Sequence, residues 1–382
     1  MSRLERMVGG ALLLLLSGCQ PATPPVGATR TTPAPTARQT PSPLPPCSAT
    51  AATGGAEVLK AGLPGPDDLA FDPDGRLLIS DIHAGTVSRL NPDGSITVVA
   101  RGLSAPEGMV IAPDGRLLIA EQGRNRVVAV DLATYAVSLW RTFPNRTGRD
   151  GIDGIGPRLP NGDIVVPDSP NGVVWRVSAD GKSETRIGSG MARPVGAATD
   201  AQGHIFVADE GGPLWVLEPG QRRLTTLSTP DDVVVSAGGH LFVNTIGDGA
   251  IHELDSLGHT IEVMRNIRGP QGIALDGADN LYYTEFDAGR VDRVVRTFLL
   301  GTTKVSATGH GTDVICPNIR RAAGYADALV LTPDSKAAGA IVRVQQPGVD
   351  ASGAIEVRPS AGTVTFSIGA GALTLSQTVA LP

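Results

Sequence analysis

The chain has 382 residues, a formal net charge of −6, and 41% hydrophobic but only 4% aromatic residues. A mildly acidic chain without a basic stripe lacks the charge that neutralises phosphates, which argues against nucleic acid as a partner. Its 48 glycines and 30 prolines favour turns and short strands over long helices. The length suits one large repeat domain with appendages.

The N-terminus carries a targeting signal. Two arginines precede an apolar run at 8–16, which is too short to span a bilayer. The run continues into Leu-Ser-Gly-Cys at 16–19, which resembles the bacterial lipobox. This resemblance implies that residues 1–18 are a lipoprotein signal peptide and that Cys19 is lipidated. The protein would then be extracytoplasmic and held at a bacterial cell membrane by its lipid alone. An ordinary secretory signal with an incidental cysteine is the alternative.

Residues 19–46 are predicted to be a disordered tether. After the cysteine, this stretch consists mainly of proline, threonine and alanine, with few large apolar side chains. Such a segment buries too little surface to offset the entropy that it would lose on ordering. We therefore expect an extended linker that holds the next domain away from the membrane.

One phrase of the sequence recurs, as PDGRLLISD at 73–81 and PDGRLLIAE at 113–121. Each copy has short β-branched runs separated by turn residues, which predicts antiparallel strands joined by tight turns. Four such strands in about forty residues are typical of a β-propeller blade. The sequence therefore predicts an all-β fold, a six-bladed β-propeller over residues 47–300. The turn position of the six copies is occupied by Gly75, Gly115, Gly162, Gly203, Gly239 and Asp279.

A propeller of this kind also needs a strand that closes the ring. The last copy ends at 292–298 without an outermost strand, whereas the first copy is preceded by a spare one at 56–63. We expect this N-terminal strand to complete the sixth blade, because closure removes two open sheet edges.

The repeat also has a family likeness. PQGIALDGADNLYYTE at 270–285 resembles NHL repeats, and it resembles the six-bladed senescence-marker/gluconolactonase family and the streptogramin lyases. The likeness covers residues 56–298 and implies the propeller fold. It implies no single activity, because this architecture serves enzymes and binding modules alike.

Carboxylates recur at the ends of the second strands. In a blade, the first strand lines the central channel and the second runs antiparallel to it, so that these ends face one mouth of the channel. We expect their acids to cap the adjacent loops by accepting backbone N–H groups. The residues at this position are Asp81, Glu121, Asp168, Asp209, Thr245 and Glu285.

A second set of carboxylates opens the first strands. Carboxylates that point toward a narrow axis repel one another unless a cation lies among them, and oxygen ligands favour a hard ion such as Ca²⁺ or another divalent cation. A solvated acidic funnel without metal is the alternative. The predicted metal ligands are Asp67, Glu107, Asp153 and Asp231.

The gluconolactonase-like family places its divalent-metal ligands at this position, using Glu, Asn and Asp. The resemblance implies Glu107 and Asp231 as ligands, but Val195 is apolar and no asparagine occupies such a position. Streptogramin lyases combine a metal with histidine and glutamate, whereas here Asp287 stands where a histidine would help catalysis. His83 is the only histidine in an equivalent loop, and the sequence identifies no catalytic residue.

Residues 301–382 have β-rich runs between glycine-rich turns and predict a small C-terminal β domain. Cys47 precedes the closing strand and Cys316 follows the last blade. Outside the cytoplasm, and with Cys19 lipidated, these two remaining cysteines are free to form a disulfide that clamps the closing strand.

The sequence as a whole predicts a surface-anchored, extracytoplasmic, monomeric propeller. We expect it to bind an unknown small molecule or protein on its acidic channel face, with a divalent metal as a candidate cofactor. The alternative is a metal-dependent lactonase or esterase resembling gluconolactonase, in which Ca²⁺ held by carboxylates polarises a carbonyl.

Overall fold

The structure is a computed structural model that describes residues 44, 47, 55–144, 150–348, 351–359 and 362–382. The predicted signal peptide, Cys19 and most of the predicted tether lie outside the described residues. Among the residues described, no helix is both long and apolar enough to cross a membrane.

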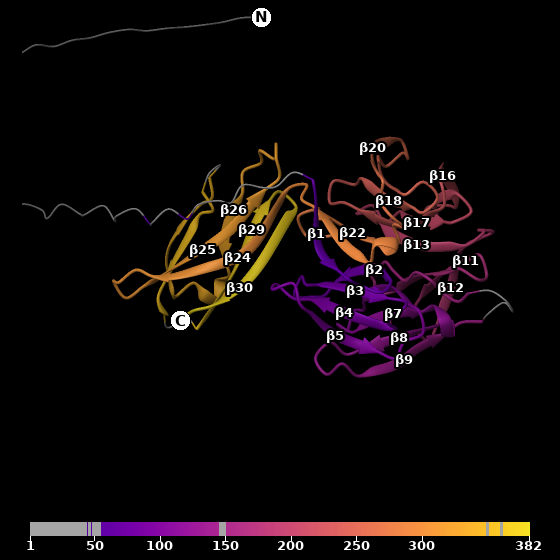
Figure 1. Ribbon diagram of the computed structural model, residues 1–382, viewed down its shortest axis with the longest axis horizontal. Coiled ribbons are helices and arrows are strands. Elements are labelled where there is room, and N and C mark those ends of the chain that lie inside the picture. The colour runs from indigo at the N-terminus through magenta and orange to yellow at the C-terminus, as the bar shows by residue number, and fades with distance from the viewer. Residues whose placement is uncertain (1–43, 45–46, 48–54, 145–149, 349–350, 360–361) are drawn as a thin grey trace, which may run out of the picture. The chain divides into compact units, whose positions relative to one another are not determined.

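The repeats form six sheets between residues 56 and 294, as an all-β propeller requires. The first two sheets are β2 (Pro66–Phe71), β3 (Leu77–Asp81), β4 (Thr86–Leu90) and β5 (Ile96–Arg101), followed by β6 (Pro106–Ile111), β7 (Leu117–Glu121), β8 (Arg126–Val130) and β9 (Val137–Thr142). Figure 1 shows the strands of the first sheet succeeding one another from β2 at the centre to β5 at the rim. The predicted propeller fold is thereby confirmed.

The core lies between neighbouring sheets. Every residue of β3 and of β7 is buried, because these second strands pack against a blade on either side. One cluster joins the first two blades across their interface, and its apolar side chains supply the main stabilisation of the ring. Its members include Leu78, Val87, Met109, Ile119 and Val128.

The third blade departs from the predicted four-strand pattern. In the described part of this blade only three strands form a sheet, and the innermost strand is replaced by an irregular chain at 150–157. The reason is local, since this stretch is rich in glycine and lies against both neighbouring blades. The blades in this part of the chain are β10 (Ile164–Asp168), β11 (Val173–Val177) and β12 (Glu184–Ser189); β13 (Pro194–Thr199), β14 (Ile205–Asp209), β15 (Pro213–Val216) and β16 (Arg222–Thr226); and β17 (Pro230–Val235), β18 (Leu241–Thr245), β19 (Ala250–Leu254) and β20 (Thr260–Arg265).

The last sheet closes the ring as predicted. It contains β21 (Ile273–Leu275), β22 (Leu281–Glu285), β23 (Arg290–Val294) and the N-terminal β1 (Ala56–Ala61). β1 pairs antiparallel with β23, and Figure 1 shows the indigo N-terminal strand against the orange strands of this sheet. Short 3₁₀ turns follow β7 and β22 as η1 (Gln122–Arg124) and η2 (Phe286–Ala288).

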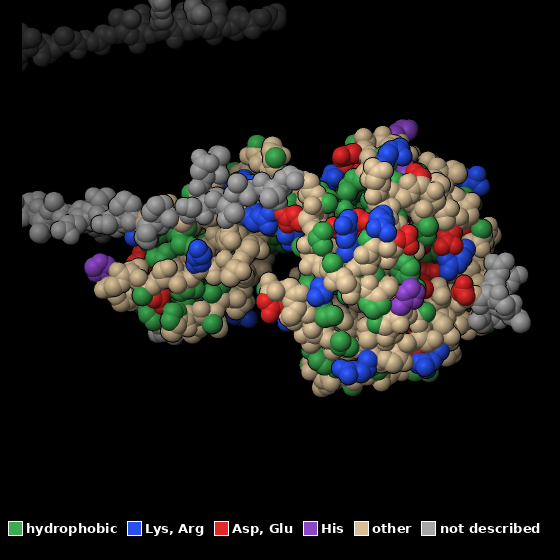
Figure 2. Space-filling view, in the orientation of Figure 1, with side chains coloured by type: hydrophobic (Ala, Val, Ile, Leu, Met, Phe, Trp, Pro, Cys, Tyr) green, Lys and Arg blue, Asp and Glu red, His purple; other side chains and the backbone are tan. Residues whose placement is uncertain are grey.

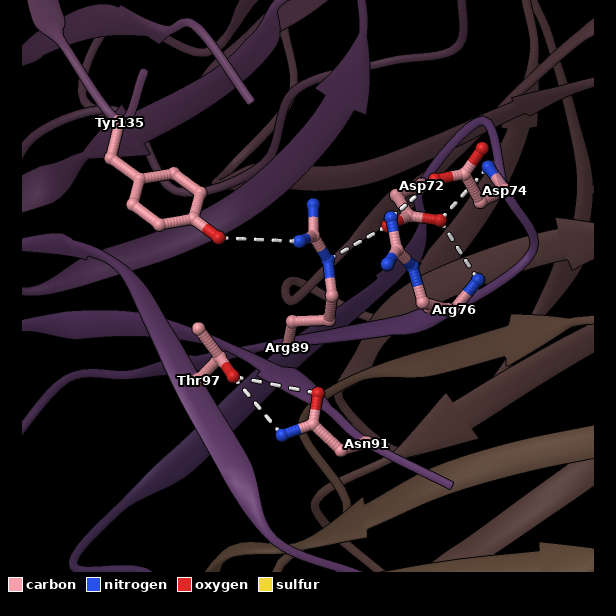
Figure 3. A network of polar contacts seen from close by, with 7 residues as sticks. All are labelled: Asp72, Asp74, Arg76, Arg89, Asn91, Thr97 and Tyr135. Carbon is pink, nitrogen blue, oxygen red and sulfur yellow. Dashed lines mark hydrogen bonds and ion pairs between the residues drawn. The ribbon is translucent and has the colours of Figure 1, made fainter. Parts of the chain in front are cut away.

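The turn within the recurring phrase is closed by the aspartate that precedes it. Asp72 Oδ1 accepts the backbone N–H groups of Asp74 at 3.0 Å and Arg76 at 2.9 Å. Asp72 Oδ2 lies 2.8 Å from Arg89 Nε, and Arg89 also donates to the Tyr135 hydroxyl of the next blade at 3.4 Å (Figure 3). In the first blade, Asp72 therefore both closes the hairpin turn and holds an arginine that contacts the next blade.

The C-terminal part is all-β, as predicted, and has two sheets. Its strands are β24 (Phe298–Ala307), β25 (Asp313–Arg321), β28 (Ala354–Val357) and β27 (Ile341–Gln345) in one sheet, and β26 (Val330–Pro333), β29 (Thr363–Ala370) and β30 (Leu373–Ala380) in the other, with η3 (Ser335–Ala337) between β26 and β27. β24 spans the boundary that the sequence predicts between residues 300 and 301. The core includes Phe298, Ile319, Ile355 and Phe366.

The predicted disulfide is present between Cys47 and Cys316, whose Cα atoms lie 5.4 Å apart. Cys316 belongs to β25, and Cys47 packs in a small apolar cluster with Val314 and Ala354. The bridge therefore fastens the segment before β1 to the C-terminal sheet and not to a blade.

Candidate functional site

The carboxylates of the first strands stand in β-bulges. In the first blade Pro66 pairs with Asp81, but the next pair is Leu69 with Ile79, so the first strand carries one extra residue at this point. A bulge interrupts the ladder and re-aims the side chains it contains, and bulges are frequent beside active sites. The same irregularity recurs at 67–68, 107–108, 195–196 and 231–232.

Asp153 lies near the same positions but does not belong to a β-bulge. It lies in the irregular chain of the third blade, where its backbone carbonyl accepts the N–H of Gly108 at 3.0 Å. The following residue, Gly154, is packed so tightly that an added Cβ would lie 2.1 Å from the Val195 carbonyl oxygen. The absence of a side chain at residue 154 therefore lets this segment lie between its two neighbouring blades and present Asp153 to the channel.

These residues surround one cavity of about 140 Å³ in the channel. Asp67, Asp153 and Asp231 line it, and burial of Glu107 beside Asp153 brings the fourth predicted ligand to its edge. Three of the four predicted metal ligands, from three different blades, thus line one cavity, and Glu107 lies near them. Val195 and Gln271, which occupy the corresponding positions of the other two blades, line the same cavity.

The carboxylates strongly influence one another. Burial raises the pKa of Asp67, Glu107 and Asp231 well above its ordinary value, and the neighbouring charge of Asp153 raises each of them further. Glu107 and Asp153 lie close enough to share a hydrogen bond. In the absence of a cation, this arrangement favours protonated carboxyl groups.

Asp67 differs from the other predicted ligands in its lack of side-chain hydrogen-bond partners among the described residues. Its side chain is only 9% exposed, and it accepts no hydrogen bond from any residue that the structure describes. Because Asp67 lines the cavity, a ligand, an ion or water in the cavity can satisfy its carboxylate.

An arginine that the sequence analysis missed contacts one of the carboxylates that line this cavity. Arg193 Nη2 donates to Asp153 Oδ2, and Arg193 Nη1 lies 2.6 Å from Glu210 Oε1. Gln122 Nε2 also donates to Asp153, at 3.1 Å. The sequence could have indicated this role, because Arg193 directly precedes Pro194, which opens the first strand of the fourth blade, close to the positions of the predicted ligands.

A second pair of acids, also missed, holds the bulges together. Asp68 Oδ1 accepts the N–H of Leu69 at 2.7 Å, and Asp68 Oδ2 accepts the N–H of Met109 in the next blade at 3.0 Å. Asp232 accepts the N–H of Val233 at 2.7 Å, and burial raises the pKa of Asp232 to about 7. These acids line the cavity, but their backbone contacts make them part of its frame.

The second-strand acids cap loops, as predicted. Asp81 accepts the N–H of Ala84 at 2.8 Å, and Glu121 accepts the N–H of Ser104 at 2.9 Å. Asp168 differs, because its described partners are the side chains of Asn171 and Trp175. His83 lies apart from the carboxylates, with Nδ1 3.0 Å from the Pro64 carbonyl oxygen.

The face of the propeller seen in Figure 2 does not share the charge imbalance of the cavity. Figure 2 shows acidic and basic side chains interspersed over the face of the propeller in view. Within the cavity, by contrast, Arg193 is the one cationic side chain among the described residues that contacts the predicted ligands. The excess of carboxylates is therefore a property of the buried site.

The donor chemistry of the cavity fits a hard cation, because its carboxylate oxygens are the ligands that Ca²⁺ prefers. As arranged, no three Asp, Glu, His or Cys side chains in the described parts of the chain are close enough to hold an ion together. Arg193 donates a hydrogen bond to Asp153, while the Asp67 carboxylate accepts no hydrogen bond from the described residues. Cation binding would therefore require the carboxylates to move closer together, and Arg193 would compete with the cation for Asp153 Oδ2.

Comparison with known proteins supports the propeller. The family model of the SMP-30/Gluconolactonase/LRE-like region matches residues 56–195, which is less than half of the chain. No curated protein matches the chain.

Several solved structures have a similar fold. A gluconolactonase from Xanthomonas campestris is 20% identical with a TM-score of 0.55, over 66% of this chain and 95% of that one. A calcium-binding protein, regucalcin, from Agrobacterium tumefaciens is 17% identical with a TM-score of 0.54, over 64% of this chain and 95% of that one. A putative gluconolactonase is 16% identical with a TM-score of 0.54, over 72% and 96% of the two chains. At these identities the likeness shows the fold alone. This chain therefore carries an SMP-30/gluconolactonase/LRE-like region, at residues 56–195, within a β-propeller.

Proposed function

We propose that the protein binds a divalent cation such as Ca²⁺ in the channel cavity and, at that cation, a small polar ligand. The observation that carries this proposal is the carboxylate of Asp67, which lines the cavity and accepts no hydrogen bond from the described residues, with Asp153, Asp231 and Glu107 near it. A cation would supply the missing charge, satisfy Asp67 and relieve the repulsion that raises the pKa values of its neighbours.

The size of the cavity limits the ligand. A volume of about 140 Å³ holds an ion with a few water molecules or one small functional group. Pockets that enclose a whole drug-sized molecule usually measure about 300–1,000 Å³. The proposed ligand therefore presents a hydroxyl, carboxylate or carbonyl group to the ion, and the rest of the ligand, whether a small molecule or part of a protein, stays outside.

We further propose that the propeller acts outside the cytoplasm, anchored to a bacterial membrane through Cys19. The Cys47–Cys316 disulfide supports this location, because such bonds persist in oxidising compartments. A monomer is the proposed form, since ring closure by β1 leaves the sixth sheet with its full set of strands.

Catalysis on a lactone or related ester is the second candidate. The family match at 56–195 favours it, because the matched residues include Asp67, Glu107 and Asp153. A bound divalent cation would supply Lewis-acid polarisation of a carbonyl. The test is turnover of a panel of lactones by the purified protein with and without EDTA. Turnover that EDTA abolishes would establish this activity, and no turnover would leave the binding role.

Calorimetric titration of metal-free protein with Ca²⁺ tests the main proposal. We expect wild-type protein to bind, and Asp67→Asn to bind at least about tenfold more weakly, because one ligand loses its charge. Asp287→Asn is the matched control, since Asp287 is exposed in η2 and does not line the cavity. Equal affinity in all three proteins, or no binding to the wild type, would contradict the proposal.

A further inference from the structure

We infer that Arg193 is a tethered counter-cation, which competes with diffusible cations for Asp153 and thereby selects divalent over monovalent ions. This inference rests on the proposed function and deepens it. It starts from the two partners of the guanidinium, which are Asp153 in the lining of the cavity and Glu210 outside that lining.

The backbone that carries Arg193 is held firmly in place. Asp209 Oδ1 accepts the N–H of Arg193 at 2.8 Å, and Asp209 Oδ2 accepts the N–H of Ala192 at 3.1 Å. Asp209 also accepts from the indole Nε1 of Trp215 at 3.1 Å. The loop is thus fixed to its own blade, and only the side chain of Arg193 needs to move for Asp153 to be released.

The guanidinium would keep one charged partner if it left Asp153. The Arg193 side chain is 26% exposed, so it lies at the mouth of the cavity and not in its interior. Its ion pair with Glu210 does not involve the cavity carboxylates. If a cation takes Asp153, Arg193 can therefore withdraw toward solvent and keep one charged partner.

Asp67 provides the independent indication that the cavity takes a ligand. It is buried, lines the cavity and accepts no hydrogen bond from the described residues, whereas Asp153 has both Arg193 and Gln122. The arginine therefore neutralises one side of the cavity and leaves the other side unsatisfied. A ligand that satisfies Asp67 has to be positive and has to reach past the guanidinium.

The charges of the competing ions decide the outcome of this competition. A potassium or sodium ion would replace one positive charge by another and would gain little for the loss of the Arg193–Asp153 contact. A calcium ion brings two charges, and so it gains attraction to Asp67, Glu107 and Asp231 beyond the attraction that is lost. Arg193 therefore sets a threshold that divalent cations pass and monovalent cations do not.

The test is calorimetric titration of the full mature chain with Ca²⁺, with and without about 100 mM KCl. A bulky organic salt is present in both titrations, so that charge screening is similar and the specific effect of K⁺ can be seen. With Arg193→Gln we expect Ca²⁺ affinity to rise roughly tenfold, because the competing charge is gone, and K⁺ then to compete with Ca²⁺. Arg268→Gln is the matched control, since this exposed arginine on the loop before β21 contacts no cavity carboxylate. It should bind Ca²⁺ as the wild type does.

A second variant keeps the test decisive if Arg193→Gln fails to fold. Glu210→Gln removes the outer partner, so the guanidinium stays on Asp153 and Ca²⁺ affinity should fall. Unchanged or weaker Ca²⁺ binding by a folded Arg193→Gln protein, or unchanged binding by Glu210→Gln, would overturn the inference while wild-type binding upheld the proposed function. No Ca²⁺ binding by any of these proteins would overturn both.

Discussion

The Arg193 guanidinium donates a hydrogen bond to the Asp153 carboxylate, although the two residues lie 40 positions apart and belong to different blades. The contact joins the irregular inner chain of the third blade to the loop that enters the fourth. It places a positive charge against one of the carboxylates that the sequence predicts as metal ligands. The balance between this charge and a free cation is central to the predictions below.

Stability should fall as pH rises when no divalent cation is present. The pKa of the Asp232 carboxyl is about 7 in the folded protein against an ordinary value of 3.8, and those of Asp67, Glu107 and Asp231 are also raised. The folded state therefore binds more protons than the unfolded state. The resulting stabilisation is complete below pH 3.8 and is lost as pH rises through about 7.

The free energy of unfolding, measured with urea in EDTA at several values between about pH 5 and pH 8, tests this prediction. Most proteins are most stable in this range, so a fall in stability across it would stand out. Saturating Ca²⁺ is the control, because a bound cation stabilises the ionised carboxylates and should flatten or reverse the slope. A free energy of unfolding that rises steadily with pH in EDTA would contradict the prediction.

Gly154→Ala should disturb the site through packing. The added Cβ would lie 2.1 Å from the Val195 carbonyl oxygen, so the chain that carries Asp153 must shift. We expect a loss of about 1–3 kcal/mol in the free energy of unfolding, together with weaker Ca²⁺ binding. Gly220→Ala is the control, since nothing lies within 4 Å of its added Cβ. Equal unfolding curves for the two variants would show that the inner chain is not confined as described.

Removal of the disulfide should destabilise the protein. Cys47 and Cys316 are 269 positions apart, and a cross-link over so long a loop typically contributes about 2–4 kcal/mol. The double variant Cys47→Ser, Cys316→Ser should show this loss in urea unfolding. Thiol titration of wild-type protein exported to its native compartment is the check. Two free thiols in that protein would show that the disulfide does not form in the compartment where the protein acts.

Mass spectrometry of the mature protein tests the membrane anchor. The lipobox-like sequence predicts an N-terminus at Cys19 that carries acyl chains. Cys19→Ala should abolish lipidation and release the protein from the membrane. A mature N-terminus at another residue, without lipid, would end this prediction.

The repeat and its closure could be predicted because they depend on local pattern. Turn residues such as PDG and the β-branched runs specify the hairpins, and the spare run at 56–61 fills the outer position that the last blade lacks. The convergence of Asp67, Glu107 and Asp231 followed from their equal places in successive blades. Asp153, one residue out of register, still reaches the cavity because its segment is not a regular strand.

The rest of the site depends on contacts between blades, which a repeat alignment does not show. Arg193 occupies a loop position that the other copies do not use in this way, and its side chain crosses to the preceding blade. Asp68 and Asp232 resemble ligands in sequence, but their role is fixed by backbone N–H groups, such as that of Met109 in the neighbouring blade. The missing inner strand of the third blade likewise reflects close packing around Gly154.

The central claim is that the channel carboxylates hold a divalent cation, and the melting temperature of the purified protein in Ca²⁺ and in EDTA tests it most directly. At a Ca²⁺ concentration a hundredfold above the dissociation constant, the folded state should gain about 2.7 kcal/mol, so the melting temperature should rise with Ca²⁺ and fall with EDTA. Glu107→Gln should reduce both responses. A melting temperature that responds to neither Ca²⁺ nor EDTA, in protein that retains no metal, would contradict the account.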